Sequence, residues 1–581
     1  MSLGSALTIA TSSLKTTQTA ISIASSNIAN ADVVGYTRKT AAPQTVVVGG
    51  ISSGVSLSDI QRLVDAGLEK RTNTARTQSA EADVLAAYLS ELSSALGSTT
   101  DDDTIASVIG DLTASLKALA ISPESGSEMQ NVVSDLAAIA DSANQLTSSI
   151  QSLRQDADQK IADSVDTVNQ ALHNLDELNQ QILRANAAGA STADLVDQQM
   201  QQVAIISGQI NVSYFTDSNG AMTVYGPGGV GLLTDSVHEL SFTATSGIDS
   251  TDIYDPSSAG GLSGISVGDR EITSYISGGA IGGLLTVRDD TLVAEQALVD
   301  NLTAGILDAV NTAQNAGTSV PAPSTLTSSQ ALTGGDALNG TGTLRIALLD
   351  ASGNVQSYTD LNLSAYATID DLVGALDGLA GISASYDSAG KLVLSSDDPS
   401  LGIGMAQISG GVGSDNETLS AALGLNDLMT RDATGKLSVR SDILADPSLL
   451  AVGALSTDAA LAVGDAGIAG GDTSAIDAMI AALAEDRSFP GAGGMAATTT
   501  DLASYAGAFI SHVAVSASTA EASAAIKSGA LSSLENSLAS KSGVNLDEET
   551  AELEILQTNY QAAAKVVTVI QEMYDTLLNM V

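Results

Sequence analysis

Several residue types are missing or scarce in this chain of 581 residues. Cysteine and tryptophan are absent, and phenylalanine occurs only four times. The absence of cysteine excludes disulfide bonds and thiolate metal sites. The core must therefore be built mainly from Ala, Leu, Val and Ile, which suits long, closely packed helices and thin sheets.

Basic residues are scarce as well. The chain has 22 Lys and Arg against 67 Asp and Glu, which gives a formal net charge of −45. Nucleic acid is not expected as a partner, because phosphate binding requires clustered cations. The acidity fits solubility at high local concentration and equally fits adaptation to a saline medium, and the sequence leaves both readings open.

Long apolar runs are also missing. No run approaches the roughly 18–20 apolar residues of a membrane span, so no membrane partner is expected. The N-terminus lacks a basic stretch followed by an apolar core, so no cleavable secretory signal is expected. If the protein leaves the cell, it uses a route that leaves its N-terminus uncleaved.

Proline is confined to part of the chain. All nine prolines lie between Pro43 and Pro490, and residues 124–226 contain none. Because an interior proline costs a helix about 3 kcal/mol, the proline-free stretches are the helical candidates. From about Glu128 to Asn186 apolar residues recur at three-four spacing, which predicts a helix about 90 Å long at ~1.5 Å per residue. Further helices are expected at residues 3–31, from near Ile60, and at 281–313, 474–485 and 501–541.

Both ends of the chain carry apolar residues in an alternating three-four rhythm. Such residues form a seam that must face another helix. We expect the two ends to pair with each other, with copies of the chain, or with both, so the chain is expected to be a self-assembling subunit. The predicted assembly interface consists of Leu3, Leu7, Leu14, Ile21, Ile28, Leu546, Leu553, Leu556, Tyr560, Val567, Ile570, Tyr574 and Leu577.

Four similar turns occur in the middle of the chain, each with Asp first and Gly three residues later. This spacing is typical of hairpin loops, in which glycine accepts a positive φ. Residues 211–280 are therefore expected to be rich in β-structure. Residues 324–435 are expected to form a module with strands and one helix, which has a capping box at Thr368 and Asp371. The turns are Asp217–Gly220, Asp350–Gly353, Asp387–Gly390 and Asp432–Gly435.

The order of these segments is nested, which predicts a mixed fold, mainly α with β-rich parts, whose two ends return to one place. The predicted inner domain is a terminal α-helical coiled coil made of residues 1–34 plus 543–581. A rod-like helical domain of residues 35–317 plus 436–542 should follow it, with a β portion near 211–280. An inserted α+β outer domain is expected at residues 318–435.

The two ends, residues 1–34 and 543–581, are expected to be largely disordered in the free monomer and to fold on assembly. Burying four large seam residues of the first helix yields roughly 6–12 kcal/mol. Ordering about 28 residues costs roughly 30–50 kcal/mol of backbone entropy before hydrogen bonds are counted. Isolated helices of modest length are also marginal in water.

Two segments beside the seams resemble the signatures of a known family. Ser26-Asn-Ile-Ala-Asn-Ala31, followed by Gly35-Tyr-Thr-Arg38, resembles the N-terminal signature of flagellar rod, hook and hook-associated proteins. Ser542-Gly-Val-Asn-Leu-Asp-Glu-Glu-Thr550, followed by Gln557-Thr-Asn-Tyr-Gln-Ala-Ala-Ala564, resembles their C-terminal signature. Family members often have Pro before the glycine, where this chain has Val34. The matching signature residues are Asn27, Asn30, Gly35, Tyr36, Arg38, Asn545, Asp547 and Glu548.

The resemblance implies a structural subunit of the extracellular bacterial flagellum, secreted by type III export and needing no cofactor or metal. Its length and C-terminal block look most like the first junction subunit between hook and filament. The implied partners are copies of itself in a helical tube, the hook protein, the second junction protein and an export chaperone. The alternatives are another axial component, such as hook, distal rod or second junction protein, and, less favoured, a secreted surface adhesin or enzyme.

Short stretches of the sequence match enzyme motifs, but they lack the structural context that those motifs require. The stretch Gly226–Gly231 matches a dinucleotide fingerprint, but β-like residues follow it where a helix is required. Ser52 lies in a G-x-S-x-G match whose flanks look like two strands rather than a strand and a helix. None of the three histidines, His173, His238 and His512, has a second ligand at metal-binding spacing. The chain is therefore not expected to be an enzyme.

Overall fold

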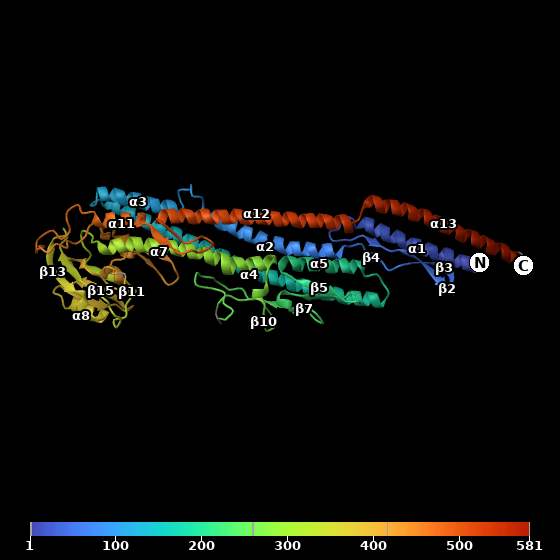
Figure 1. Cartoon of the computed structure of the whole chain (residues 1–581), viewed down its shortest axis with the longest axis horizontal. Helices are drawn as coiled ribbons and strands as arrows, with labels where there is room; N and C mark the ends of the chain where they lie inside the picture. Colours follow the sequence, from blue (N-terminus) through green and yellow to red (C-terminus); the bar gives the residue numbers. More distant parts are fainter. Residues whose placement is uncertain (1–2, 258–260, 415, 580–581) are drawn as a thin grey trace.

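The computed structural model describes residues 3–257, 261–414 and 416–579. They form an elongated molecule, and its first and last helices, α1 (Leu3–Ala29) and α13 (Leu546–Asn579), lie together at one extremity (Figure 1). The opposite extremity carries the inserted α+β module. The predicted mixed, mainly α fold is confirmed. The expected terminal domain also includes residues 1–2 and 580–581, which lie outside the described residues.

A bundle of long helices forms the rod between these extremities. Its longest member, α4, has 62 residues, as the proline-free stretch predicted. The N-cap side chains of Asp65, Ser125 and Asp501 begin α2, α4 and α12 by accepting hydrogen bonds from backbone N–H groups in the first turn. The rod helices are α2 (Ala66–Leu96), α3 (Ile105–Ile121), α4 (Gly126–Ala187), α5 (Ala193–Gln209), α6 (Gly279–Leu285), a π-helical turn η3 (Thr286–Thr291), α7 (Leu292–Ala316), α10 (Ser441–Ala445), η5 (Pro447–Leu449), α11 (Ser474–Ala484) and α12 (Leu502–Ser542).

The rod core is aliphatic and continuous along α4. Leu136, Leu172 and Leu175 of α4 are fully buried, together with Leu302 and Ile306 of α7. Near the outer end of the rod, Phe489 and Tyr505 stack with ring centroids 3.8 Å apart. The predicted restart of helix near Ile60 is wrong. Residues 61–62 form a strand, and α2 begins at Ala66 after the cap Asp65.

Short strands lie along the side of the rod. Asparagines on α4 dock them, because each one both donates to and accepts from the backbone of a single strand residue. Asn144 binds Leu437, Asn169 binds Leu240 and Asn179 binds Met222, at 2.8–2.9 Å. The predicted β portion near 211–280 is present, and the strands beside the rod are β5 (Ser213–Thr216), β6 (Met222–Tyr225), β7 (Gly231–Leu233), β8 (Leu240–Ser241), β9 (Ser266–Val267), β10 (Arg270–Glu271), β17 (Met429–Arg431), β18 (Leu437–Val439), β19 (Arg487–Phe489) and β20 (Thr498–Thr500), with 3₁₀ turns η1 (Pro227–Gly229) and η2 (Thr273–Tyr275).

The inserted module contains two three-stranded antiparallel sheets, in the orders β11-β15-β14 and β13-β12-β16. The predicted capping box of Thr368 and Asp371 begins its helix α8. A separate cluster of buried aliphatic side chains forms its core. The elements are β11 (Thr325–Ala331), β12 (Thr343–Leu349), β13 (Val355–Asn362), η4 (Leu363–Ala365), α8 (Ile369–Asp377), β14 (Ile382–Tyr386), β15 (Lys391–Ser396), β16 (Gly402–Ser409) and α9 (Leu419–Leu423).

All four predicted Asp-to-Gly turns form as expected. In each, the carboxylate of the first residue accepts hydrogen bonds from backbone N–H groups two and four residues later. The fourth residue, a glycine, has a φ between +78° and +87°. This left-handed conformation is strained for residues with a Cβ atom, which explains the glycine at that position.

The boundary of the inserted module differs from the expected residues 318–435. Met429 and Val439 pack into the rod core, so the hairpin of β17 and β18 belongs to the rod. Leu455, Leu461 and Ile468 instead pack against the module, beyond its expected end. The chain therefore crosses between the rod and the inserted module more often than the pattern of turns indicated. In the described part of the chain, no helix combines the length and apolarity needed to cross a membrane.

Candidate assembly site at the terminal helices and their hinge

The two terminal helices pack against each other through the small residues of α1. Ala10, Thr17 and Ala24, which recur every seven residues, are 3–8% exposed. On α13, Ile570 is 6% exposed. The small row lets the helices approach closely, which explains why α1 carries Ala and Thr rather than Leu on this face.

The predicted assembly interface is only partly covered within one molecule. On α1, Leu3, Leu7, Leu14, Ile21 and Ile28 are half-buried. On α13, Ile570 is buried, whereas Leu553, Leu556, Val567 and Tyr574 are half-buried. Leu546, Tyr560 and Leu577 are 48%, 39% and 53% exposed.

A second apolar row on α13 was missed in the sequence. Ile555, Val566, Val569 and Met573 are 47–56% exposed, and Leu577 belongs to the same face. Their spacing of three, four and eleven residues places them on one side of the helix, beside the seam that contacts α1. The helix is therefore apolar on two faces, and one molecule covers only one of them.

A β-hairpin of strands β2 (Pro43–Val48) and β3 (Ile51–Leu57) lies along α1, as the two expected strands predicted. The backbone N–H of Val55 donates to Ser12 Oγ at 3.1 Å, and Thr16 Oγ1 donates to the Val55 carbonyl at 3.1 Å. A Cβ atom at Gly54 would lie 2.7 Å from Ser12 Oγ, so glycine permits this approach. Every residue of β2 is exposed.

Asn27 organises the hinge at which α1 meets the rod. It is 1% exposed. Its Oδ1 accepts from Tyr36 Oη at 2.9 Å and from the Lys39 N–H at 3.0 Å. Its Nδ2 donates to the Lys39 carbonyl and to Glu549 Oε2, both at 3.0 Å. One side chain therefore joins the end of α1, the chain that follows it, and the start of α13.

Arg38 connects the same chain to the C-terminal segment. Its guanidinium binds Glu549 at 2.6 Å and Glu548 at 3.1 Å. Its backbone N–H donates to the Ser542 carbonyl at 2.8 Å, and its carbonyl accepts from the Leu63 N–H at 2.8 Å. Residues from both ends of the chain are thus fixed around one arginine.

Asp197 of α5 anchors this assembly to the rod. The carboxylate accepts from the Thr37 N–H at 3.1 Å and from Thr37 Oγ1 at 2.7 Å. It also pairs with Lys39 Nζ and, at 2.6 Å, with Arg62 Nε of strand β4 (Gln61–Arg62), which pairs with β1 (Lys39–Thr40). Lys39 is 5% exposed and its Nζ lies 3.5 Å from the centroid of the Tyr36 ring. Buried charges that are paired in this way fix the relative positions of the segments that carry them.

The structure brings together Asn27, Tyr36, Arg38 and Glu548 of the predicted signature. Asn30 instead bonds the Ser26 carbonyl of its own helix, and Asn545 Oδ1 accepts from the N–H groups that begin α13. Gly35 has a φ of +81° and packs against Gln201, so it shapes the turn without joining the cluster. Asp547 is exposed.

The sequence did not single out Lys39, Arg62 or Asp197, and Glu549 lay within the C-terminal signature segment without being named as a matching residue. Lys39 and Glu549 adjoin signature residues in the chain, which was the one available signal. Asp197 lies about 160 residues from Thr37 and has no motif around it.

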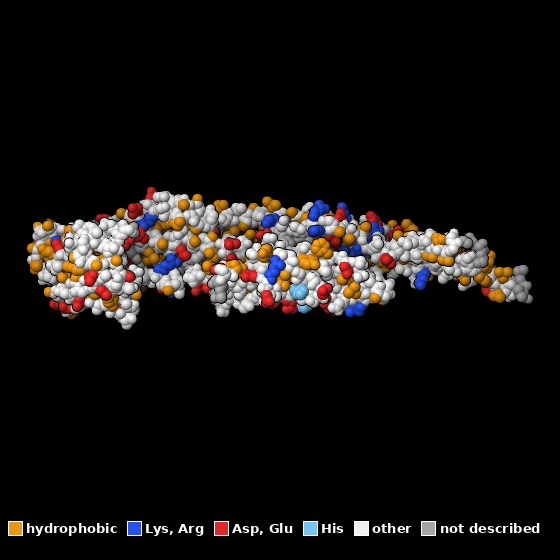
Figure 2. Space-filling model, turned by 60° about the horizontal axis from the view of Figure 1, so that its bottom comes forward, with side chains coloured by type: hydrophobic (Ala, Val, Ile, Leu, Met, Phe, Trp, Pro, Cys, Tyr) orange, Lys and Arg blue, Asp and Glu red, His pale blue; other side chains and the backbone are white. Residues whose placement is uncertain are grey.

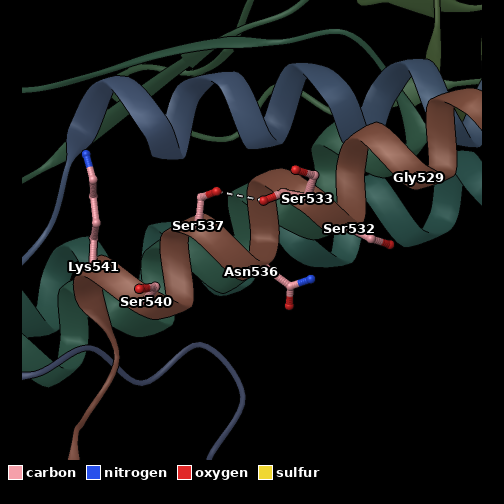
Figure 3. A pocket seen from close by; sticks show the side chains of 7 residues that line it. All are labelled: Gly529, Ser532, Ser533, Asn536, Ser537, Ser540 and Lys541. Atoms are coloured by element: carbon pink, nitrogen blue, oxygen red, sulfur yellow. Dashed lines mark hydrogen bonds between the residues drawn. The ribbon is translucent and has the colours of Figure 1, made fainter.

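A hollow of about 660 Å³ adjoins the hinge between the turn at residues 31–37, α2, α5 and the end of α12. Val33 and Val34 on its rim are 51% and 91% exposed, and Ile205 is 43% exposed. Next to it, α12 presents a polar surface on which Ser532, Asn536 and Ser540 point away from α2 (Figure 3). Lys541 reaches back to Asp65 at 3.2 Å. A hydrogen bond from the Leu68 N–H, and then this lysine, lower the pKa of Asp65.

The enzyme-like motifs lie elsewhere and lack the required context. Gly226–Gly231 is a tight turn between β6 and β7 with no following helix, and Ser52 lies within the β2–β3 hairpin. His173 pairs with Glu239, and His512 Nε2 lies 2.7 Å from the Gly493 carbonyl. Across the described residues, no cluster of three or more acidic or histidine side chains has a metal-binding arrangement.

Comparison with known proteins agrees with the signatures. A model of the flagellar hook-associated protein FlgK helical domain matches residues 89–323. Models of the flagella basal body rod protein and of the flagellar basal body rod FlgEFG protein C-terminal match residues 7–37 and 536–580. These last two matches cover α1 with the first part of the hinge, and α13 with the end of α12.

The relatives that align with nearly the whole chain share one name. Flagellar hook-associated protein 1 of Escherichia coli is 27% identical, and that of Salmonella typhimurium is 26% identical, each over 98% of both chains. A solved structure of the flagellar hook junction protein FlgK from Burkholderia pseudomallei is 17% identical, covers 80% of this chain and 99% of its own, and gives a TM-score of 0.48. Both terminal signatures are built into one hinge, the helical-domain match lies in the rod, and the chain resembles flagellar hook-associated protein 1 over 98% of its length.

Proposed function

We propose that this chain forms a layer of the junction between the flagellar hook and the filament, as a structural subunit that performs no catalysis. The paired helices α1 and α13 carry this proposal, because they extend beyond the rod (Figure 1). They also leave apolar side chains exposed to solvent. An exposed apolar face of this kind marks an interaction site. Burial against neighbouring copies removes it from water, at roughly 25 cal/mol per Å².

In this assembly the terminal helices of many copies form an inner tube, with the rods around them. The half-buried rows of Leu and Ile on α1 and the exposed row on α13 are the faces available to neighbouring copies. The inserted module, at the opposite extremity, lies farthest from the tube axis. The hinge around Asn27, Arg38 and Asp197 holds each helix pair at a fixed angle to its rod.

The relatives are named for their association with the hook, and this supports the hook protein as one neighbour. The second junction protein is proposed as the other neighbour, because the resemblance of the terminal signatures implies it. Before assembly, the exposed apolar face of α13 must be bound by another protein in the cell. We propose that an export chaperone binds this face, because exposed apolar rows on helices are otherwise prone to non-specific association.

The test compares three strains of the source bacterium, which carry the full chain, no chain, or a chain that ends at Ser542 and lacks α13. Without the chain we expect bare hooks and secreted flagellin in the medium. The truncated chain should be soluble with a folded rod, as judged by circular dichroism, and should give the same bare hooks. Normal filaments in the strain without the chain would overturn the junction role. Normal filaments with the truncated chain would show that α13 is not an assembly face.

A further inference from the structure

We propose that Lys70 and Arg71 at the start of α2 bind Asp547 and Glu554 near the start of α13 in a neighbouring copy of this chain. The proposal rests on the proposed function, because it specifies one contact between copies in the axial assembly. It adds an electrostatic contact to the apolar faces of the terminal helices.

The charge of the chain is unevenly distributed. Residues 1–76 contain seven Lys and Arg against four Asp and Glu, although the whole chain has a net charge of −45. Residues 543–581 contain one Lys and seven Asp and Glu. Figure 2 shows Lys and Arg side chains gathered over the end of the rod that adjoins the terminal helices. Opposite charges therefore adjoin the hinge from two sides.

The basic side of the contact is free for a partner. Lys70 and Arg71 are exposed, and neither makes an ion pair within the described residues. The neighbouring exposed positions of α2, Gly67, Thr74 and Gln78, are uncharged. The other cations of this region are already bound, since Arg76 pairs with Glu535 and Lys541 with Asp65, whereas Arg62 pairs with Asp197 and Glu69.

The acidic side is equally free. Asp547 and Glu554 are exposed and lie seven residues apart, which places both on one face of α13, two turns apart. Neither carboxylate has an ion-pair partner in the part of the chain that the structure describes. Their neighbours Glu548 and Glu549 are bound to Arg38 of the same molecule.

The two patches cannot meet within one molecule. Lys541 at the end of α12 contacts Asp65 before α2, so these two positions lie at the same level of the rod. Arg71 lies about 9 Å from that level into the rod, and Glu554 lies about 12 Å along α13 in the other direction, at ~1.5 Å per residue. A copy displaced along the long axis by about 20 Å brings them together. Such a contact is heterologous, and it repeats from copy to copy in a helical array.

A second copy fits this surface because both halves of the contact are present in every chain, with two charges of each sign. The acidic pair also adjoins the exposed apolar row of α13, so the contact continues the proposed interface between copies. Complementary charges at the margin of an apolar interface select the register of the partners more than they add affinity.

Cross-linking tests the proximity directly, because the natural chain has no cysteine. Arg71→Cys and Glu554→Cys chains are produced together in one strain that lacks the natural chain. Isolated flagella are then treated with a short bis-maleimide reagent, since an Arg–carboxylate pair holds its Cα atoms farther apart than the roughly 7 Å of a disulfide. We expect a dimer band that neither variant gives alone and that Lys117→Cys with Glu554→Cys does not give. Lys117 is an exposed lysine of α3, distant from the hinge.

Charge reversal tests the interaction. Lys70→Glu with Arg71→Glu, or Asp547→Lys with Glu554→Lys, should reduce filaments per cell by about fivefold or more. Combining all four substitutions in one chain should restore them to within about twofold, because each contact is then reversed on both sides. The matched control Lys117→Glu with Lys436→Glu makes the same change in net charge as the Lys70 and Arg71 reversal, at exposed sites elsewhere, and should leave filaments unchanged.

The outcomes separate this inference from the proposed function. No cross-link in flagella that bear filaments, or a four-residue variant as defective as either pair, overturns the inference while the junction role stands. A cross-linked product with the mass of a different protein also overturns it, because the partner is then not a second copy. Filaments in the strain without the chain overturn the proposed function itself.

Discussion

The attachment of the terminal helices to the rod depends on one carboxylate, and Asp197→Ala tests that dependence. The side chain of Asp197 is 5% exposed, and it binds Thr37, Lys39 and Arg62. Its removal leaves two cations with little access to water, because the side chains of Lys39 and Arg62 are 5% and 10% exposed.

The expected cost follows from these contacts. Removing one partner of a buried ion pair costs about 3–5 kcal/mol. We expect the lower figure, because Lys39 keeps Asp194 at 3.0 Å and Arg62 keeps Glu69 at 2.8 Å. A loss of about 3 kcal/mol, at about 1.36 kcal/mol per tenfold change, increases local opening of the hinge by about 100-fold.

Hydrogen exchange at the amides of Thr37 and Leu63 measures that opening. The Thr37 N–H donates to Asp197, and the Leu63 N–H donates to the Arg38 carbonyl. Asp194→Ala is the matched control on the same helix, since Asp194 is 73% exposed and contacts Lys39 alone through an ion pair. An exposed pair is worth about 0.2–1 kcal/mol, so the control should change exchange by less than about fivefold. Equal acceleration by the two substitutions would refute the argument from burial.

Three further predictions concern other parts of the chain. In the free monomer, amides of α1 and α13 should exchange within seconds to minutes while those of α4 stay protected; sharp protection of both ends would contradict folding on assembly. Burial raises the pKa of Glu295 from its usual 4.5 to about 7, so the folded state binds this proton more tightly than the unfolded chain does. Its stabilisation is full below about pH 4 and is lost as the pH rises through 7, so Glu295→Gln should match the natural chain in urea at pH 4 and exceed it by about 3 kcal/mol at pH 8; equal stability at both pH values would exclude the shift. Leu376→Ala removes a fully buried side chain of α8 and should destabilise the inserted module by about 2–5 kcal/mol, and calorimetry should show a separate transition that moves down while the rod transition stays in place.

Local features of the fold were largely predictable from the sequence. The 62-residue helix α4 follows from three-four spacing in a stretch without proline, and the Asp-to-Gly turns follow from glycine's tolerance of positive φ. The capping box at Thr368 follows from side-chain reach over three residues. Each of these depends on residues close together in the chain, so no knowledge of tertiary contacts was needed.

The candidate site was only half predictable. The signature identified Asn27, Tyr36, Arg38 and Glu548, because they lie in two short motifs at the ends of the chain. Asp197 was not predictable, because its partners Thr37 and Lys39 approach it only after α5 folds back beside the hinge. The predicted boundary of the inserted module was wrong for a similar reason. A hairpin's strands are visible in sequence, but the body that buries them is not.

The amino-acid sequence by itself determined that both ends are amphipathic helices with the signatures of one family, and that the chain is acidic and free of cysteine. Periodicity and composition are local properties, and they persist whatever the surroundings. Tertiary structure alone decided which apolar row each terminal helix buries, because α1 packs its small Ala and Thr row against α13 and leaves the larger row half-exposed. It also decided that a buried aspartate in the rod holds both chain ends, since buried charges are stable only where folding brings partners of opposite sign into contact.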